Sequence, residues 1–422
     1  MDIQPNRRRM LSGLCGVGVA GLAGCTDSVP GGGTMATDDG EEIGGTDRTI
    51  KIGTMLPLSG PRSTVGESIR DAAVLPIEQV RDEVALEIEH AGADTESDPA
   101  AAVQAAASLV DEGYPMVTGP LDSDIVLQVT QQVLIPYQTV CCSPGATTPT
   151  ITTLNDGGLV FRTAVSDSVQ GTVLAEIAAT DLGGDSAATL YVNNDYGWQL
   201  SQAFSRSFRD DHGGTITEQI PIDESATSYA AELDRAADGD PDVLVLATYP
   251  EMGETLFSDL GAEYDADVLV TDGLREGDLH DLVDHSLDGI RGTAPLIDGP
   301  GSDAFADLYA DAYGADPGLF ESNAYDASAV LLLANAYAGQ NDGRAIQSAI
   351  RAVTSGGGEE VTPETLAEGL ELAASGTAVE YRGASNETRF DENGDTMDTT
   401  FEYWEFDESA DGGIAEIDRI TA

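Results

Sequence analysis

The sequence is very poor in basic residues. Lys51 is its only lysine, and 19 Lys+Arg stand against 75 Asp+Glu, for a formal net charge of −56. A surface this acidic repels nucleic acids and anionic membranes, so neither is an expected partner. The acidic residues are spread between apolar runs along the whole chain and do not form a tail. Because molar salt screens such repulsion, the composition predicts a protein adapted to very high salt, as in halophilic archaea. The alternative, an acidic metal-buffering protein, lacks the acidic spacing of a calcium loop.

Cysteine and histidine are also scarce, with four of each. Cys15 and Cys25 lie near the N-terminus, and the other two form the adjacent pair Cys141-Cys142, so no disulfide framework is predicted. Two small buried residues explain the pair most simply; a vicinal disulfide and a metal site stay open as alternatives. None of the histidines follows a predicted strand, and no nucleophile elbow, metal-ligand cluster or phosphate loop occurs. The sequence therefore predicts no enzyme, no cofactor and no metal.

The N-terminus has the pattern of an export signal. Residues 7–11 read RRRML, and a short apolar stretch of small residues leads to Cys25. The stretch is too short to span a membrane, and the paired arginines resemble a twin-arginine signal. Leu22-Ala23-Gly24-Cys25 resembles a lipobox, in which the cysteine receives the lipid, although an accidental match is the alternative. We expect a signal peptide at 1–24 and a Gly-rich, acidic linker at 25–47, lipid-anchored through Cys25.

After this linker, short apolar runs alternate with amphipathic helical patterns in two consecutive sets. The first set predicts strands at 49–56, 84–90, 115–118 and 137–142, and the second at 187–192, 215–221, 243–247 and 268–271. Such alternation predicts an α/β fold with parallel sheets covered by helices, here as two Rossmann-like lobes. Beyond residue 292 the patterns are mostly helical and predict a return to the first lobe, before a last strand at 401–406. The predicted lobes are 48–164 plus 293–400, and 165–292 plus 401–422.

Ligand sites in parallel sheets lie beyond the carboxyl ends of the strands. In the first set these positions carry hydroxyls, backbone N–H groups and a helix start, which suit a carboxylate. In the second set they carry aromatic residues and one acid, which suit an ammonium group and an apolar body. The two sets together predict a cleft for a zwitterion. The candidate ligand-binding residues are Ser123, Gly145, Thr147, Tyr196, Tyr249 and Asp272.

Each candidate also has a purely structural interpretation. Ser123 and Thr147 are loop hydroxyls of the kind that cap helices. Asp272-Gly273 is a common turn pair, and Tyr249, between an apolar strand and Pro250, is compatible with a plain packing corner. The residue types alone leave these alternatives open.

Several motifs in order resemble one known family, the type I solute-binding proteins of branched-chain amino-acid ABC transporters. The resemblance runs from Ile50 to about Phe406. It rests on these motifs: Ile50-Lys51-Ile52-Gly53, Leu58-Ser59-Gly60-Pro61, Asp94-Thr95-Glu96-Ser97-Asp98-Pro99, Ser143-Pro144-Gly145-Ala146-Thr147, Asp195-Tyr196-Gly197, Tyr249-Pro250-Glu251-Met252-Gly253 and Phe390-Asp391-Glu392-Asn393-Gly394-Asp395. It implies two Rossmann-like lobes joined by a three-strand hinge, the type I periplasmic binding protein fold.

The resemblance also implies roles for the first-lobe candidates. Ser123 matches a serine whose hydroxyl and N–H bind the ligand carboxylate. Gly145 stands where a backbone carbonyl accepts from the α-ammonium, and Thr147 where a threonine contacts both groups.

In the second lobe, the resemblance implies that Tyr196 is a closing tyrosine and Tyr249 an aromatic wall. Asp272 occupies the position of the acid that pairs with the ammonium. Val65 departs from members that carry an aromatic residue at that position, so the resemblance does not imply a valine-like or leucine-like specificity.

The function implied is an extracellular, lipid-anchored substrate-binding protein of an ABC importer, which captures a branched-chain amino acid or a related amino acid or amide. Its partners would be that small ligand, a membrane permease and ATPase subunits. The protein would be a monomer, exported by the twin-arginine route and held at the outer face of the cell membrane by lipid only. A ligand-sensing receptor module of the same fold, for amides, urea or another small polar solute, is the alternative.

Overall fold

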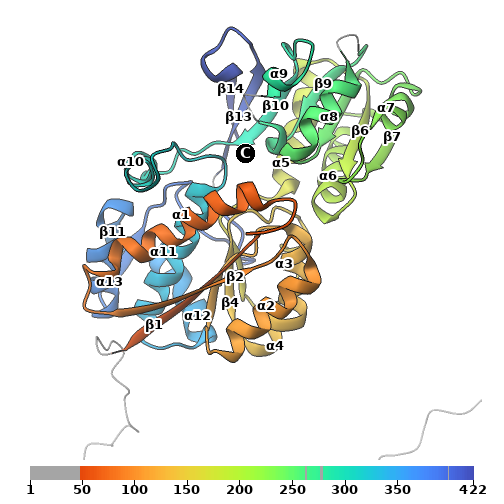
Figure 1. Ribbon diagram of the computed structural model, residues 1–422. Helices are drawn as coiled ribbons and strands as arrows, with labels where there is room; N and C mark the ends of the chain where they lie inside the picture. The colour runs from red at the N-terminus through yellow and green to blue at the C-terminus, as the bar shows by residue number, and fades with distance from the viewer. Residues whose placement is uncertain (1–47, 262–263, 276–278, 398) are drawn as a thin grey trace, which may run out of the picture. The chain divides into compact units, whose positions relative to one another are not determined.

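The computed structural model describes residues 48–261, 264–275, 279–397 and 399–422. The signal peptide, the linker and the lipidated Cys25 predicted above lie outside the described residues. Within the described part, no helix is both long and apolar enough to cross a membrane. Two main sheets and the helices beside them organise the chain (Figure 1).

The first sheet has five parallel strands in the order β2-β1-β3-β4-β5. The strands are β1 (Thr49–Leu56), β2 (Glu87–Asp94), β3 (Met116–Thr118), β4 (Val140–Ser143) and β5 (Val160–Arg162). Two core clusters, one on each face, bury this sheet: one is shared with α1, α11, α12 and α13, the other with α2 and α3.

The helices beside the first sheet come from two distant parts of the chain, coloured orange and blue in Figure 1. The earlier part supplies α1 (Ser63–Arg81), α2 (Pro99–Asp111), α3 (Ser123–Val129), the π-helical η1 (Thr130–Leu134) and α4 (Ile135–Tyr137). The later part supplies α10 (Ser302–Tyr313), α11 (Glu321–Ala338), α12 (Gly343–Thr354), η4 (Pro363–Thr365) and α13 (Leu366–Ala374). A small parallel pair, β11 (Glu359–Val361) with β12 (Val379–Tyr381), lies beside α13.

The second sheet has seven strands in the order β14-β13-β10-β9-β8-β6-β7. Neighbouring strands from β6 to β10 pair in parallel, whereas β13 pairs antiparallel with both β10 and β14. The strands are β6 (Ser186–Val192), β7 (Thr215–Ile222), β8 (Val243–Ala247), β9 (Asp267–Val270), β10 (Arg291–Pro295), β13 (Thr400–Phe406) and β14 (Ile414–Thr421). The helices that accompany this sheet are α5 (Asp167–Glu176), η2 (Ile177–Asp181), α6 (Asp195–Asp210), α7 (Ala230–Ala237), α8 (Pro250–Leu260), η3 (Asp272–Leu274) and α9 (Leu279–Leu282). A short 3₁₀ turn, η5 (Asp411–Gly413), precedes β14.

The chain passes three times between the two sets of elements. It leaves the first sheet after β5, returns to α10 after β10, and crosses again between β12 and β13. The predicted α/β fold with parallel sheets is therefore confirmed.

Helix α11 shows why the late helices belong with the first sheet. Sixteen of its 18 residues are buried, and it contacts α1, α12, α13 and strands β1, β3 and β4. Helices buried on all sides lack a polar face, which explains the mixture of small and aliphatic residues here. Helix α2 begins with a capped N-terminus, because Asp98 accepts a hydrogen bond from the Ala101 amide, 2.8 Å away, directly before Pro99.

Some predicted elements differ from the structure. The strand predicted at 84–90 is β2, three residues further on, and the strand predicted from residue 137 begins only at Val140, since Tyr137 ends a helical turn. The apolar pattern of the sequence did not predict strands β5, β10, β11, β12 and β14 or helix α13.

Candidate functional site

A cavity of about 380 Å³ lies at the carboxyl ends of strands from both main sheets. Its lining contains all six residues that the sequence predicts, namely Ser123, Gly145, Thr147, Tyr196, Tyr249 and Asp272. The volume is in the range of small-molecule sites. The two halves of the predicted site are thus brought together in space.

On the side of the first sheet, Ser123 begins α3 directly after the loop that follows β3. Its hydroxyl oxygen accepts a hydrogen bond from the Thr148 amide at 3.3 Å. The hydroxyl proton of Ser123 is thereby left to donate elsewhere, and the side chain lines the cavity. Thr147 lines the same cavity from the loop after β4, so two hydroxyl-bearing residues contribute to this side of it.

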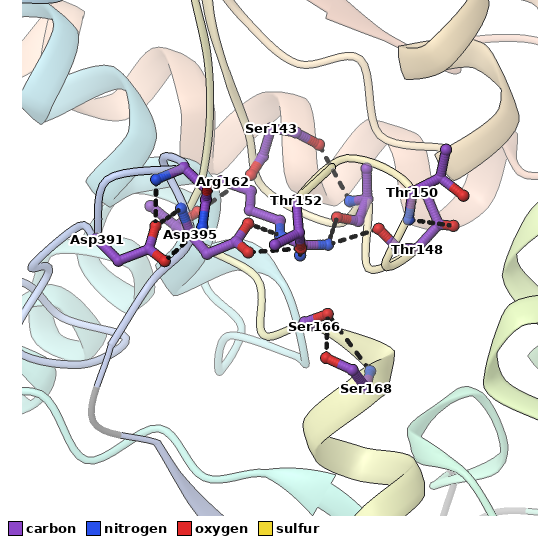
Figure 2. A network of polar contacts seen from close by, with 12 residues as sticks. Ser143, Thr148, Thr150, Thr152, Arg162, Ser166, Ser168, Asp391 and Asp395 are labelled. Atoms are coloured by element: carbon purple, nitrogen blue, oxygen red, sulfur yellow. Dashed lines mark hydrogen bonds and ion pairs between the residues drawn. The ribbon is translucent and has the colours of Figure 1, made fainter. Parts of the chain in front are cut away.

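The loop that carries Thr147 is held by a buried arginine (Figure 2). Arg162 is fully buried, and its Nη1 donates to the carbonyl oxygens of Ala146 at 3.2 Å and Thr148 at 3.0 Å. Its Nε donates to Asp395 Oδ1 at 2.7 Å. Bonds to the carbonyls on either side of Thr147 fix the backbone there and therefore the direction of its side chain.

Gly145, in the same loop, is needed for close packing. A Cβ atom at this position would lie 2.4 Å from Cδ1 of Leu121. The glycine lets the main chain of this loop reach the cavity, so its contribution is made by backbone atoms.

On the side of the second sheet, two tyrosines form an aromatic wall. The ring centroids of Tyr196 and Tyr249 lie 5.3 Å apart with planes 25° from parallel, a stacked arrangement. Tyr196 shares a hydrogen bond of 2.9 Å with the Thr271 hydroxyl, and Tyr249 accepts one of 2.8 Å from Asn194 Nδ2. Hydrogen bonds at both hydroxyls hold the rings in place.

Asp272 follows β9 and begins the short turn η3. The turn packs closely, because a Cβ on Gly273 would lie 2.2 Å from the Thr248 carbonyl oxygen. Asp272 is buried, and its Oδ1 has no hydrogen-bond partner among the described residues. Burial raises the pKa of Asp272 to about 6, against a smaller lowering by the Gln170 side chain. A buried carboxylate with an unpaired oxygen in a cavity is suited to receive a cation.

Several charged residues in or near the cavity were not found from the sequence, among them Glu251 and Glu321 of its lining. Arg62 and Asp122 line it, joined by an ion pair of 2.8 Å between Nη1 and Oδ1, and Arg62 lies 4.0 Å from the centre of the Tyr249 ring. Asp167 begins α5 and donates its backbone N–H to the Thr147 carbonyl at 2.9 Å. An arginine in the loop between the first strand and the first helix, in a chain with 19 basic residues, was the available signal for Arg62. No comparable signal marked Asp122 or Asp167.

The charges at the cavity are mostly negative. Burial is the largest cause that raises the pKa of Asp122, to about 6, while Arg62 opposes the rise. Burial and the charge of Asp272 raise the pKa of Asp167 well above its usual range, against a lowering by the Thr147 side chain and Arg162. In the part of the chain that the structure describes, no three His, Cys, Asp or Glu side chains are arranged to hold a metal ion.

Two sheets of mainly parallel strands, covered by helices, share a small-molecule cavity at the carboxyl ends of their strands. This arrangement defines the class of protein, a two-lobed solute-binding protein. A family model described as "Periplasmic binding protein" matches residues 49–362. The chain belongs to this family, which confirms the resemblance seen in the sequence.

Relatives and solved structures agree with this assignment. The chemotactic signal transduction system substrate-binding protein BasB of Halobacterium salinarum is 27% identical over 348 residues, which are 80% of this chain and 82% of that protein. The crystal structure of the leucine-binding protein LivK of Thermotoga maritima matches with a TM-score of 0.73 and 23% identity, over 88% of this chain and 98% of that chain. A solute-binding protein of an ABC transporter from R. palustris, in complex with benzoate, matches with a TM-score of 0.69 and 18% identity, over 88% and 96% of the two chains. Because both structures are under 25% identical, they establish the fold alone.

Proposed function

We propose that this protein captures an amino acid, of the branched-chain or a related type, between its two lobes and delivers it to an ABC importer. The observation that carries the proposal is the unpaired Oδ1 of buried Asp272, in the same cavity as the hydroxyls of Ser123 and Thr147. An α-ammonium group would pair with Asp272, and the carboxylate would accept from the two hydroxyls. Tyr196 and Tyr249 would close over the body of the ligand.

The charges at the cavity favour an amino acid over an aromatic acid of the kind bound by one structural neighbour. Its lining holds four carboxylates, from Asp122, Glu251, Asp272 and Glu321, against the single guanidinium of Arg62. A ligand whose only charge is negative would be repelled there, whereas an ammonium group would be attracted.

Titration calorimetry in molar salt against the common L-amino acids and benzoate tests the proposal. We expect heat of binding with at least one amino acid and none with benzoate. Absence of heat with every amino acid would contradict the function, and tight binding of benzoate would contradict the assigned role of Asp272.

We also propose that the mature chain begins at Cys25, carries lipid there and is exported folded by the twin-arginine route into a very salty medium. The supporting pattern is Arg7 to Leu11 followed by Leu22-Ala23-Gly24-Cys25, together with the net charge of −56. A Cys25→Ala variant is expected in the culture medium, while the natural sequence stays in the membrane fraction. Equal membrane retention of both would contradict lipid anchoring at this residue.

Sensing is the second candidate, because one relative is named a chemotactic signal transduction substrate-binding protein. Deletion of the gene separates the two functions. Lost uptake of the ligand supports import, and lost attraction to the ligand with unchanged uptake supports a receptor.

A further inference from the structure

Unpaired carboxylate oxygens gather around the cavity and nowhere else in the described chain. Among the described residues, five buried carboxylate oxygens lack a hydrogen-bond partner, and they belong to four residues: Asp122 (Oδ2), Asp167 (Oδ1 and Oδ2), Glu224 (Oε1) and Asp272 (Oδ1). Asp122 and Asp272 line the cavity and are more than nine-tenths buried. A buried acceptor without a donor lowers the stability of the fold, so the gathering of several at one place needs an explanation.

A structural acid in the same chain shows the contrast. Asp326 is fully buried, and its two oxygens accept from the Tyr381 hydroxyl at 2.7 Å, the Ala384 amide at 2.8 Å and the Ser385 amide at 2.7 Å. The fold therefore supplies donors where a buried carboxylate serves only the fold. The acids around the cavity have carboxylate oxygens without such donors, and a bound ligand would supply them.

The unpaired oxygens form two groups. Asp167 and Asp272 both act electrostatically on Tyr196, and Asp167 is bonded through its amide to Thr147, so they belong to the end of the cavity where the ammonium is proposed to bind. The second group surrounds Arg62.

In this second group, Arg62 serves two carboxylates at once. Its Nη1 lies 2.8 Å from Asp122 Oδ1, and its Nη2 lies 3.1 Å from Glu224 Oε2. One guanidinium between two carboxylates leaves one negative charge in excess, and the other oxygen of each acid stays unpaired. Asp122 lines the cavity together with Arg62, and Glu224 is paired with the same guanidinium.

We propose that the ligand is an amino acid with a basic side chain, whose second cationic nitrogen binds beside Asp122 and Glu224. This inference rests on the proposed function and names the substrate class of the same site. The α-ammonium would pair with Asp272, and the methylene groups would pack on apolar lining residues such as Val65 and Leu319. An aliphatic side chain would leave the second group without a donor, and an acidic one would be repelled by it.

Lysine and norleucine test the inference, because they differ only in the terminal ammonium group. Calorimetry in molar salt is expected to give a dissociation constant for the tightest of lysine, ornithine and arginine at least about tenfold below those of norleucine and leucine, since a charge-assisted hydrogen bond is gained. In the Asp122→Asn variant this preference is expected to shrink to within about threefold. The matched control is Asp124→Asn, which removes a neighbouring acid that does not line the cavity.

The ratio of affinities is the decisive readout, because a general loss of closure in Asp122→Asn would weaken all ligands alike. Leucine or norleucine bound as tightly as every basic amino acid would overturn the basic side-chain assignment and leave the amino-acid function intact. A preference unchanged in Asp122→Asn would remove Asp122 from the subsite. Failure of all amino acids to bind would instead contradict the proposed function itself.

Discussion

Replacing Asp272 by asparagine is expected to weaken amino-acid binding about 100-fold and, at the same time, to stabilise the ligand-free protein. Asparagine keeps the shape of the side chain but removes the charge that the ligand ammonium needs. Loss of one partner from a buried charge pair costs about 2–5 kcal/mol, and each 1.4 kcal/mol is a factor of ten in affinity.

The gain in stability follows from the unpaired carboxylate. The pKa of Asp272 is about 6 in the folded protein, raised from 3.8 mainly by burial. The folded state therefore binds a proton more tightly than the unfolded chain does. The stabilisation by the protonated acid is complete below pH 4 and is lost as the pH rises through 6, at a total cost of about 2–3 kcal/mol. Asparagine carries no such penalty.

Urea unfolding of both proteins between pH 5 and 8, in molar salt without ligand, measures this difference. The Asp272→Asn variant is expected to gain stability relative to the natural protein as the pH rises, with the difference levelling off above pH 7. The natural protein should bind its ligand about tenfold more weakly at pH 5 than above pH 7. With a pKa of about 6, only about a tenth of the Asp272 carboxyl groups are ionised at pH 5.

The matched control is Asp267→Asn, at the exposed amino end of the same strand β9. It should change neither ligand affinity nor the pH profile. An affinity of Asp272→Asn within threefold of the natural protein would remove Asp272 from the site.

The sequence predicted the residues at strand ends better than the strands themselves. Ser123, Tyr249 and Asp272 follow short strands that are mostly apolar and almost fully buried, and parallel strands bring such positions to one edge. The strands that were missed lack this signal. In β14, residues Ile414, Ile417 and Ile420 recur every three residues, which does not suggest a strand.

Strand β14 nevertheless pairs with β13 over its whole length, with a register irregularity between Tyr403 and Trp404. Exposed edge strands have little apolar burial to enforce alternation, so the partner strand decides the conformation.

Charged residues of the cavity were harder to predict than its hydroxyls and aromatics. Asp122 and Arg62 are 60 residues apart in the sequence, and Glu224 is a further 102 residues along. Their pairing depends on a contact between loops of both sheets, which no local pattern contains. In a chain with 75 acidic residues, the residue type does not distinguish a buried acid from a solvated one. Only the three-dimensional surroundings of the side chain distinguish them.

Replacing Arg162 by methionine is expected to lower the free energy of unfolding by about 3–5 kcal/mol, more than any other substitution proposed for this protein, and to abolish ligand binding. Arg162 is fully buried and joins the loop after β4 to Asp395, whose side chain is 14% exposed. Methionine fills much of the same space but removes the donor to Asp395 Oδ1 and to the two carbonyl oxygens beside Thr147, and leaves Asp395 with only the Thr152 hydroxyl as a side-chain donor (Figure 2). Removing one partner of a buried ion pair carries a penalty of this size, because the remaining charge is left uncompensated.

Urea unfolding in molar salt measures the loss, and Arg344→Met is the matched control. Arg344 also donates to a loop carbonyl, that of Gly157 at 2.7 Å, but this hydrogen bond is exposed to solvent, so its removal should cost no more than about 0.5 kcal/mol. If Arg162→Met does not fold, the milder Asp395→Asn keeps the arginine bonds to Ala146 and Thr148 and loses only the charge pair. That variant should lose about 1–3 kcal/mol of stability and bind ligand normally, because the carbonyl contacts of Arg162 orient Thr147. Weakened binding in Asp395→Asn at unchanged stability would contradict this division of roles.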